Sequence, residues 1–263
     1  MGVVNVTPDS FSDGGVHFEA GVAAAAVHEM VAAGAAIVDV GGESTRPGSD
    51  GVSLDEELRR VIPVLEGLFT VPGTVKDAAI SIDTQKAEVA RRALALGAEM
   101  VNDVSALRGD PAMAGVVAGS GAYVCLMHMQ GEPRTMQADP RYDDVVSDVA
   151  AFLEERLRVA VAAGIAEERI CLDPGIGFGK TTEQNLELVR RLDVLARLGR
   201  PVLVGFSRKR SLGRLLGDPD ATTGPLAASV AASVVAYERG ATILRAHDVR
   251  ETVEALSVAR ALA

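Results

Sequence analysis

The stretch ICLDPGIGFGK at residues 170–180 decides how the rest of the chain is interpreted. A short apolar run ends at Asp173, and a glycine-rich turn then leads to Lys180. Because glycine has no side chain, such a turn lets the backbone and the acid approach a ligand closely. Three further apolar runs end in acids or amides, namely IVDVGG at 37–42, ISIDT at 80–84 and MVNDV at 100–104. The repetition predicts one polar site assembled from the ends of many strands.

Apolar runs alternate with helical stretches along the whole chain. This pattern is typical of parallel strands covered by helices. There are eight such runs, at residues 3–6, 36–40, 79–83, 100–104, 122–127, 170–173, 201–205 and 241–246. No glycine-rich or proline-rich linker separates two halves. We therefore predict an α/β protein with a single (β/α)8 TIM barrel of parallel strands, forming one domain over residues 1–263.

The clearest helix is predicted over residues 145–163, where apolar side chains recur at steps of three and four. Charged residues lie between them, as expected for a helix with one face on a sheet. Gly34, Gly97, Gly164 and Gly199 each stand shortly before the next apolar run. A left-handed residue that ends a helix is expected at those positions.

Composition restricts the classes of partner. A net charge of −10 and a pI near 5.0 argue against binding of duplex nucleic acid, which needs a broad cationic face. No apolar run approaches the roughly 20 residues of a membrane span, so no membrane partner is expected. Cys125 and Cys171 lie inside apolar runs without metal-like spacing. They predict buried thiols in a reducing, cytoplasmic compartment.

Two common site types do not fit the motifs. A nucleotide P-loop needs a glycine five residues before Gly179, where Pro174 stands. A zinc site needs paired ligands at short spacing, and the four histidines have none. Those histidines are His17, His28, His128 and His247.

The ends of the predicted strands divide into an acceptor-rich half and a cationic half. Carboxylates and amides can accept from a ring edge that carries adjacent N–H groups, as in guanine or a pterin. Cations after the seventh and eighth strands suit a phosphate-like group. The candidates are Asn5, Asp39, Asp83, Asn102, Asp103, His128, Asp173, Lys209, Arg245 and His247. For Asp39 and Asp103, an alternative role in capping helices stays open.

Two loops are longer than the roughly two to six residues usual after a barrel strand. They cover residues 7–18 and 41–53 and are rich in Gly, Ser, Asp and Pro. We interpret them as mobile lids over the site.

Eight motifs in order resemble the dihydropteroate synthase family of folate biosynthesis. They are NVTPDSFSDGG at 5–15, GGESTRPG at 41–48, SIDT at 81–84, VNDVS at 101–105, LMHMQGEP at 126–133, DPGIGFGK at 173–180, SRK at 207–209 and RAHDV at 245–249. The resemblance implies a transferase that condenses 6-hydroxymethyl-7,8-dihydropterin pyrophosphate with 4-aminobenzoate. The products would be 7,8-dihydropteroate and pyrophosphate, with Mg²⁺ assisting and pyrophosphate leaving before the amine attacks. It also implies a homodimer and inhibition by sulfonamides.

The resemblance assigns residues to each part of the site. The pterin-binding positions are Asp83, Asn102, Asp173 and Lys209, with Met127 and Gly205 as further substrate contacts. The pyrophosphate positions are Asn5, Arg245 and His247, and Asn5 is also the expected Mg²⁺ ligand. The aminobenzoate positions are Phe11, Thr45, Arg46, Pro47 and Phe178. Asp13 is expected to stabilise the cationic intermediate, and Lys209, Arg245 and His247 join it as catalytic residues.

Two features depart from the family pattern. Many members have Ser directly after the SRK lysine as a ligand for the aminobenzoate carboxylate, whereas here Arg210 stands there and Ser211 follows. Either residue remains a candidate. Family members also usually have a segment before the first strand, so we expect either an open barrel bottom or a true start upstream of Met1. Two other functions remain open: a pterin-binding methyltransferase and a non-catalytic paralogue kept for binding or regulation.

Overall fold

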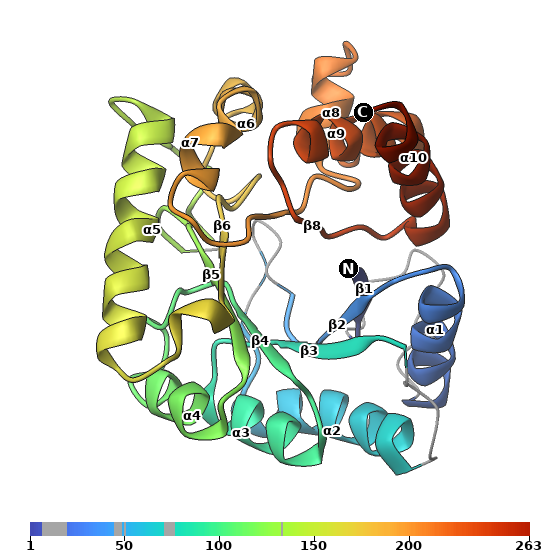
Figure 1. The fold of residues 1–263 in the computed structure, drawn as a ribbon, viewed down its shortest axis with the longest axis vertical. Coiled ribbons are helices and arrows are strands. Elements are labelled where there is room, and N and C mark those ends of the chain that lie inside the picture. The colour runs from blue at the N-terminus through green and yellow to red at the C-terminus, as the bar shows by residue number, and fades with distance from the viewer. Residues whose placement is uncertain (7–19, 45–48, 50, 71–76, 133) are drawn as a thin grey trace.

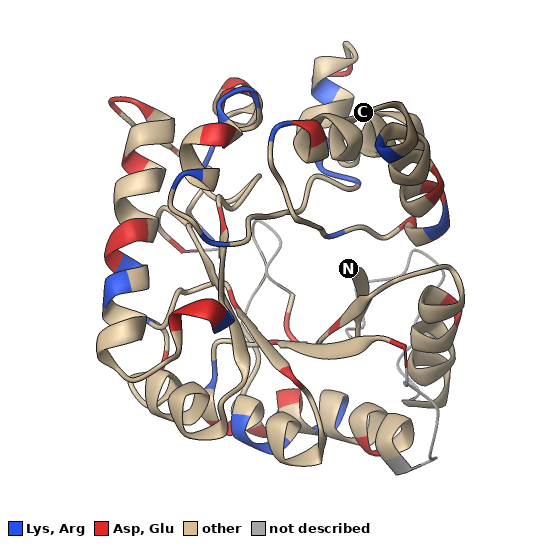
Figure 2. Cartoon of the chain, in the orientation of Figure 1, with Lys and Arg blue, Asp and Glu red and all other residues tan. Residues whose placement is uncertain are grey.

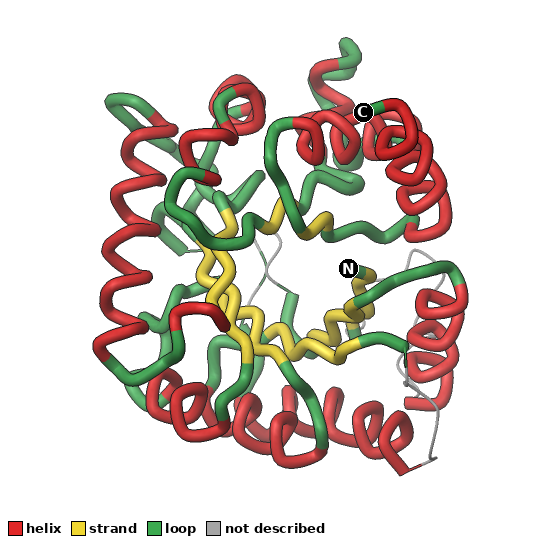
Figure 3. The backbone as a smooth tube through the Cα atoms, in the orientation of Figure 1, coloured by secondary structure: helices red, strands yellow, loops and turns green. Residues whose placement is uncertain are grey.

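The computed structural model describes residues 1–6, 20–44, 49, 51–70, 77–132 and 134–263. A ring of strands is surrounded by a layer of helices (Figures 1 and 3). The strands are β1 (Gly2–Asn5), β2 (Ile37–Gly41), β3 (Ala79–Asp83), β4 (Met100–Asp103), β5 (Tyr123–Met127), β6 (Ile170–Asp173), β7 (Leu203–Val204) and β8 (Ile243–Leu244). Each lies within or one residue beyond a predicted run.

At least one helix follows each strand, as the alternating pattern predicts. The helices are α1 (Ala20–Ala32), α2 (Leu54–Thr70), α3 (Ala87–Leu96), α4 (Met113–Ser120), α5 (Val145–Ala162), α6 (Thr182–Arg190), α7 (Leu192–Ala196), α8 (Arg210–Leu215), α9 (Leu226–Glu238) and α10 (Val249–Leu262), with a 3₁₀ turn η2 (Glu167–Arg169). None of the helices in the described part of the chain is long and apolar enough to cross a membrane.

The strands close into a barrel. β1 to β6 form one parallel sheet in chain order, and β7 pairs with β8 in parallel. Parallel bridges from Leu172 to Val202 and from Gly2 to Ala246 join the two sheets at both edges. The TIM barrel prediction is therefore confirmed, although β7 and β8 are shorter than the runs at 201–205 and 241–246.

Alternation along each strand separates the core from the barrel interior. Val38 and Val40 of β2, like Ile80 and Ile82 of β3, are buried in the core shared with the helices. Residues of the opposite parity point into the ring. Near the amino ends of the strands these are apolar, and Met100, Cys125, Cys171 and Leu203 form a cluster there. Both cysteines are buried and free, as predicted.

The helix ends follow the predicted chemistry. α5 begins where Asp144 accepts a hydrogen bond from the Ser147 N–H at 2.8 Å, which satisfies one free donor of the first turn. It ends one residue before the predicted limit, and Gly164 follows with φ +94°. Gly34, Gly97 and Gly199 also have positive φ, of +98°, +128° and +75°. The predicted helix stops are therefore confirmed.

A buried ion cluster joins the segments that follow β2 and β3. Lys86 Nζ lies 2.6 Å from Glu43 Oε2 and 2.6 Å from Glu57 Oε2. The Glu57 side chain is completely buried, whereas Lys86 is 24% exposed. Glu43 also accepts from the Val52 N–H at 3.2 Å. Lys86 lies in the loop after β3. Its ion pairs therefore link that loop to the start of α2 and to the residues on both sides of the long loop after β2.

Replacing Lys86 by Met should leave a buried, unpaired carboxylate at Glu57. We expect the free energy of unfolding to fall by about 2–4 kcal/mol, below the usual cost of breaking a fully buried pair because Lys86 is partly exposed. Urea denaturation at pH 7 measures this loss. Arg91→Met, which removes an exposed ion pair with Glu88, is the control and should leave the midpoint unchanged. Adding Glu57→Gln to Lys86→Met should restore part of the loss, and no recovery would contradict the account.

Candidate active site

The predicted ligand-binding residues meet at the carboxyl end of the barrel. Asn5, Asp83, Met127 and Asp173 are the last residues of their strands, and Asn102 is the last but one of β4. The register pairs Asn5 with Gly41, Gly41 with Asp83 and Asp83 with Asn102, while Met127 pairs with Asp173. Gly205 and Arg245 follow β7 and β8 directly. Acidic residues on the strands of the ring are visible in Figure 2.

One guanidinium is shared by two buried acids. Arg245 donates from Nε to Asp39 Oδ2 at 2.8 Å and from an Nη to Asp83 Oδ2 at 3.0 Å. Asn102 Nδ2 donates to the same Asp39 oxygen at 2.9 Å. The sequence assigned Arg245 to the pyrophosphate half of the site, but its side chain lies against Asp39 and Asp83, in the acceptor-rich half. The sequence left open whether Asp39 belongs to the site or caps a helix. In the structure it pairs with Arg245 inside the barrel.

A single cation cannot neutralise both acids, and this affects their protonation. Burial, together with the neighbouring Asp39 charge, raises the pKa of Asp83 well above its usual range, although Arg245 opposes the rise. Asp39 Oδ1 and Asn102 Oδ1 are also buried without a hydrogen-bond partner among the described residues. Buried acceptors without donors cost stability, so the site is arranged for a ligand or water that brings N–H or O–H groups.

Asp173 is 6% exposed at the end of β6. Its Oδ1 accepts from the Gly175 N–H at 2.7 Å, which orients the carboxylate. Burial raises the pKa of Asp173 to about 6, and the Gly175 hydrogen bond and nearby cations only partly oppose that rise. Asp173 is therefore mostly ionised at pH 7 in a weakly solvated position, where hydrogen bonds to a charged group are strong.

The glycine-rich turn after β6 packs directly on the loop after β5. Gly175 and Gly179 have φ of +69° and +63°, in the left-handed region that favours glycine. A Cβ at Gly175 would lie 1.9 Å from the His128 carbonyl oxygen, and one at Gly179 would lie 2.5 Å from that of Gln130. Both glycines are thus required by close backbone approach as well as by conformation.

A strained residue places Lys209 beside Phe178. Arg208 is not glycine yet has φ +57°, and its side chain is held by Asp248 through bonds of 2.6 and 3.1 Å. Its backbone N–H also donates to Ser229 Oγ at 2.9 Å. Strain of this kind persists only where surrounding contacts impose it. Lys209 follows, and its Nζ lies 4.5 Å from the centre of the Phe178 ring. The predicted pterin and aminobenzoate residues are therefore neighbours.

His247 differs from the sequence expectation in its charge. Its Nδ1 lies 3.2 Å from Ser207 Oγ, and its backbone N–H donates to the same oxygen at 3.1 Å. Burial, followed by the charge of Arg245, lowers the pKa of His247 to about 3. The imidazole is therefore neutral at physiological pH, so His247 offers an anion a hydrogen bond but no positive charge. Ser207, which the sequence gave no separate role, orients it.

Two of the candidate polar residues serve local structure. Asp103 accepts from the N–H groups of Ser105 and Leu107 at 2.8 Å each, so it stabilises the turn after β4. The His128 ring packs edge-on against Phe152 with centroids 4.9 Å apart, behind the site. Neither belongs with the ligand-facing acids.

The aminobenzoate side is only partly described. Asp13, Phe11, Thr45, Arg46 and Pro47 lie outside the described residues, as do residues 7–18 of the first expected lid and 45–48 and 50 of the second. Ser211 is buried in α8, whereas Arg210 is partly exposed on its first turn. Arg210, and not Ser211, is therefore the side chain that reaches the surface there.

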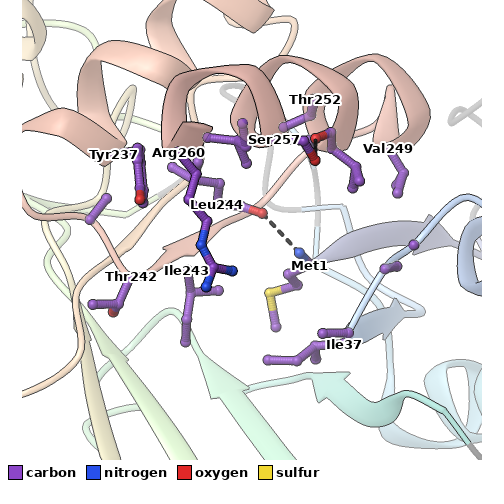
Figure 4. A pocket seen from close by; sticks show the side chains of 17 residues that line it. Met1, Ile37, Tyr237, Thr242, Ile243, Leu244, Val249, Thr252, Ser257 and Arg260 are labelled. Carbon is purple, nitrogen blue, oxygen red and sulfur yellow. Dashed lines mark hydrogen bonds between the residues drawn. The ribbon is translucent and has the colours of Figure 1, made fainter. Parts of the chain in front are cut away.

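A separate cavity opens at the amino end of the barrel (Figure 4). Its volume is about 340 Å³, and its lining includes Met1, Ile37, Ile243 and Arg260. The Met1 amino group donates to the Leu244 carbonyl oxygen at 2.9 Å within it. None of the predicted site residues lines this cavity, so it is not the candidate active site.

Comparison with known proteins agrees with this geometry. The family model described as pterin binding enzyme matches residues 1–247. The chain belongs to the pterin-binding enzyme family. Its relatives in this family include the dihydropteroate synthase of Escherichia coli K12, 47% identical over 99% of this chain and 90% of that protein. That of Neisseria meningitidis serogroup C is 46% identical over 100% of this chain and 92% of that protein.

Solved structures of pterin-binding enzymes have the same fold. Yersinia pestis dihydropteroate synthase with a sulfonamide drug complex aligns with a TM-score of 0.92 at 45% identity, covering 100% of this chain and 93% of that one. The Xanthomonas albilineans enzyme in complex with 7,8-dihydropteroate aligns with a TM-score of 0.86 at 47% identity, covering 100% and 92%. The resemblance to dihydropteroate synthases inferred from the motifs is confirmed.

Asp173→Asn should make the protein more stable, because it removes a buried carboxylate whose pKa is raised. An acid whose pKa is raised in the folded state costs stability as the pH rises from its ordinary value near 3.8 to about 6. A neutral amide removes this cost, so we expect a gain of about 2–3 kcal/mol above pH 6 and almost none at pH 4. Urea denaturation at both pH values tests this. Equal stability differences at the two pH values would contradict the assignment.

Proposed function

We propose that this chain is a transferase that condenses 6-hydroxymethyl-7,8-dihydropterin pyrophosphate with 4-aminobenzoate to give 7,8-dihydropteroate and pyrophosphate. One observation carries the proposal: the acceptors Asp83, Asn102 and Asp173 converge beside Lys209 and Arg245 at one end of the barrel. A flat, nitrogen-rich ring and an anion attached to it require such a pair of half-sites.

The pterin ring would bind to the acceptor half. The amino and amide N–H groups along one edge of the ring can donate side by side to a carboxylate, and Asp173 is oriented for this by Gly175. The unpaired Asn102 Oδ1 supplies a further buried acceptor. Leaving one such group unpaired costs about 1–3 kcal/mol, so a ring without these donors would be rejected.

The diphosphate would bind to Lys209, Arg245 and His247. Arg245 and Lys209 bring positive charge, while neutral His247 brings an N–H donor. Because Arg245 already contacts Asp39 and Asp83, it links the ring half to the anion half. Protonation of Asp83 would free part of the Arg245 charge for phosphate oxygens.

Mg²⁺ is proposed as the cofactor, with Asn5 as its protein ligand. No group of three His, Cys, Asp or Glu that could hold a metal occurs among the described residues. Asn5 offers one amide oxygen at the end of β1, next to Gly41 in register. One hard oxygen suits Mg²⁺ when phosphate oxygens and water complete its shell, so the donors fit a metal that binds with the substrate. When bound, it would neutralise negative charge on the leaving group.

The chemistry requires little acid or base from the protein. The C–O bond to pyrophosphate breaks with its electron pair on the leaving oxygen, and the aminobenzoate nitrogen then bonds to the methylene carbon and releases a proton. The protein's task is to hold the ring, receive the diphosphate and stabilise the developing cation by fixed charges. Asp13 is proposed for the last role from the sequence, and Phe178 with residues 11 and 45–47 for enclosing the aminobenzoate. Met127 and Gly205 complete the described lining.

The two alternative functions would require fewer of the charged residues in this site. A pterin-binding methyltransferase does not need the anion half of the site, and a non-catalytic paralogue does not need an intact set of charged residues. The described residues keep Lys209, Arg245 and His247 together. Relatives in the comparison that share 44–47% of their residues with this chain carry the name dihydropteroate synthase. These observations favour the condensation over both alternatives.

An assay with dihydropterin pyrophosphate, 4-aminobenzoate and Mg²⁺ tests the proposal through formation of dihydropteroate. We expect turnover that is lost with chelator, and competitive inhibition by sulfonamides against 4-aminobenzoate. Asp173→Asn should lower kcat/KM for the pterin by about 10²-fold or more, as expected for loss of a charge-assisted pair. Arg91→Met, which removes only an exposed ion pair outside the ligand-facing set, serves as the folded control. Failure of the folded wild-type protein to form product would reject the function.

We further propose that two copies associate through the outer face of α9 and α10, in a cytoplasmic protein. The two helices lie side by side on the outside of the barrel (Figure 1). Val258 and Leu262 are 60% and 84% exposed, and Val235 is 41% exposed. A shallow groove lined by Val234, Ala255, Val258 and Leu262 runs between the helices. Exposed apolar side chains gathered on one face are typical of an interface.

Val258→Asp should convert the dimer to a monomer, because it places a charge within the apolar face. Light scattering coupled to size exclusion measures the mass directly. Leu54→Asp changes an exposed leucine on α2, away from this face, and should leave the mass unchanged. A wild-type mass near 27 kDa would reject the dimer.

A further inference from the structure

The glycine-rich turn after β6 is closed by a buried lysine to which neither the motifs nor the proposed reaction gives a role. Lys180 is 2% exposed. Its Nζ donates to the carbonyl oxygens of Gly175 at 3.0 Å and Phe178 at 2.9 Å. It also lies 2.9 Å from His128 Nδ1 on the neighbouring loop. The turn is therefore folded around the ammonium group of its own last residue.

Two of these contacts lead directly to ligand-facing groups. The residue whose carbonyl accepts from Lys180 is Gly175, and the N–H of the same residue donates to Asp173 Oδ1 at 2.7 Å. The second carbonyl belongs to Phe178, whose ring lies under the Lys209 ammonium. Holding the turn thus holds the pterin anchor and the wall between the two substrates.

Other contacts hold the same turn without charge. Tyr142 Oη donates to the Gly179 carbonyl oxygen at 2.7 Å, and Gln137 Nε2 donates to that of Gly177. Asn185 Oδ1 accepts from the Gly177 N–H at 2.7 Å. Lys180 differs from these in bringing a positive charge close to Asp173. The effect of the Lys180 charge can therefore be tested separately from the effect of losing a contact with the turn.

We propose that Lys180 is a positioning residue of the pterin site, which orients Asp173 through Gly175, supports Phe178, and brings a positive charge toward the Asp173 carboxylate. The proposal deepens the function proposed above and rests on it.

The charges around Asp173 set the pH range in which Asp173 is a carboxylate beside a charged Lys180. The cations that face Asp173 are Lys180 from its own turn, Lys209 directly before α8 and Arg245 directly after β8. His128, directly after β5, is neutral, because burial and the charge of Lys180 lower its pKa to about 2. Asp39 and Asp83 lie across the barrel beside Arg245.

Asp173 and Lys180 titrate at neighbouring pH values. Burial raises the pKa of Asp173 to about 6, and burial lowers the pKa of Lys180 to about 7, although the Asp173 charge opposes that fall. The carboxylate is lost below about pH 6, and the ammonium is lost above about pH 7. Pterin affinity should therefore be highest between these values and fall on both sides.

Calorimetric titration with 6-hydroxymethylpterin over pH 5–9 tests the proposal. For Lys180→Met we expect at least tenfold weaker binding at pH 6.5, a shift of the acid midpoint to higher pH, and loss of the alkaline decline seen in wild type. Lys180→Gln keeps a donor without the charge, so it should show the same pH changes with a smaller loss of affinity. The free pterin titrates identically in every experiment. Differences in the pH midpoints between variants therefore come from groups of the protein.

Tyr142→Phe is the matched control, because it removes one uncharged contact from the same turn. It should leave both midpoints at their wild-type values. Equal midpoint shifts in Tyr142→Phe and the lysine variants would overturn the proposal, as would wild-type affinity and midpoints in Lys180→Gln. Circular dichroism confirms folding, and if Lys180→Met does not fold, Lys180→Gln decides. Absence of pterin binding by wild type would instead reject the proposed function.

Discussion

The shared guanidinium of Arg245 is the contact on which the arrangement of the site depends. It bonds two buried acids that precede it by 206 and 162 positions in the chain. Only a closed barrel brings the end of β8 opposite the ends of β2 and β3, and the bridges at Leu172 and Gly2 provide that closure. Because one cation faces two acids, the site retains an excess of acceptors that a ligand with several N–H groups can satisfy.

The site is held together at a cost in stability. Asp83 and Asp173 are buried with raised pKa values, Arg208 is strained, and Asn102 Oδ1 has no partner among the described residues. Such features persist because specific ion pairs and hydrogen bonds surround them, such as those of Arg208 with Asp248. The candidate site residues therefore lie in the part of the barrel where the sequence departs most from an apolar core.

The fold was readable from the sequence because each strand and helix follows a local pattern. Alternation in β2 and β3 separates core residues from interior ones, and Gly34 and Gly164 end helices where the chain must turn. Asp173 was readable as a site candidate as well, since it ends an apolar run before a glycine turn. Partners such as Asp39 for Arg245 and Ser207 for His247 were not, because no local pattern relates residues so far apart.

The sequence alone determined the barrel class, the strand ends that carry the site, and the family to which the chain belongs. The tertiary structure decided the state of each group: that Arg245 bridges two acids, that His247 is neutral, that Asp103 only caps a turn, and that Lys180 holds the turn of Asp173. The physical reason is that protonation and hydrogen-bond choice depend on burial and on charges from other strands. Those are set only when the ring has closed.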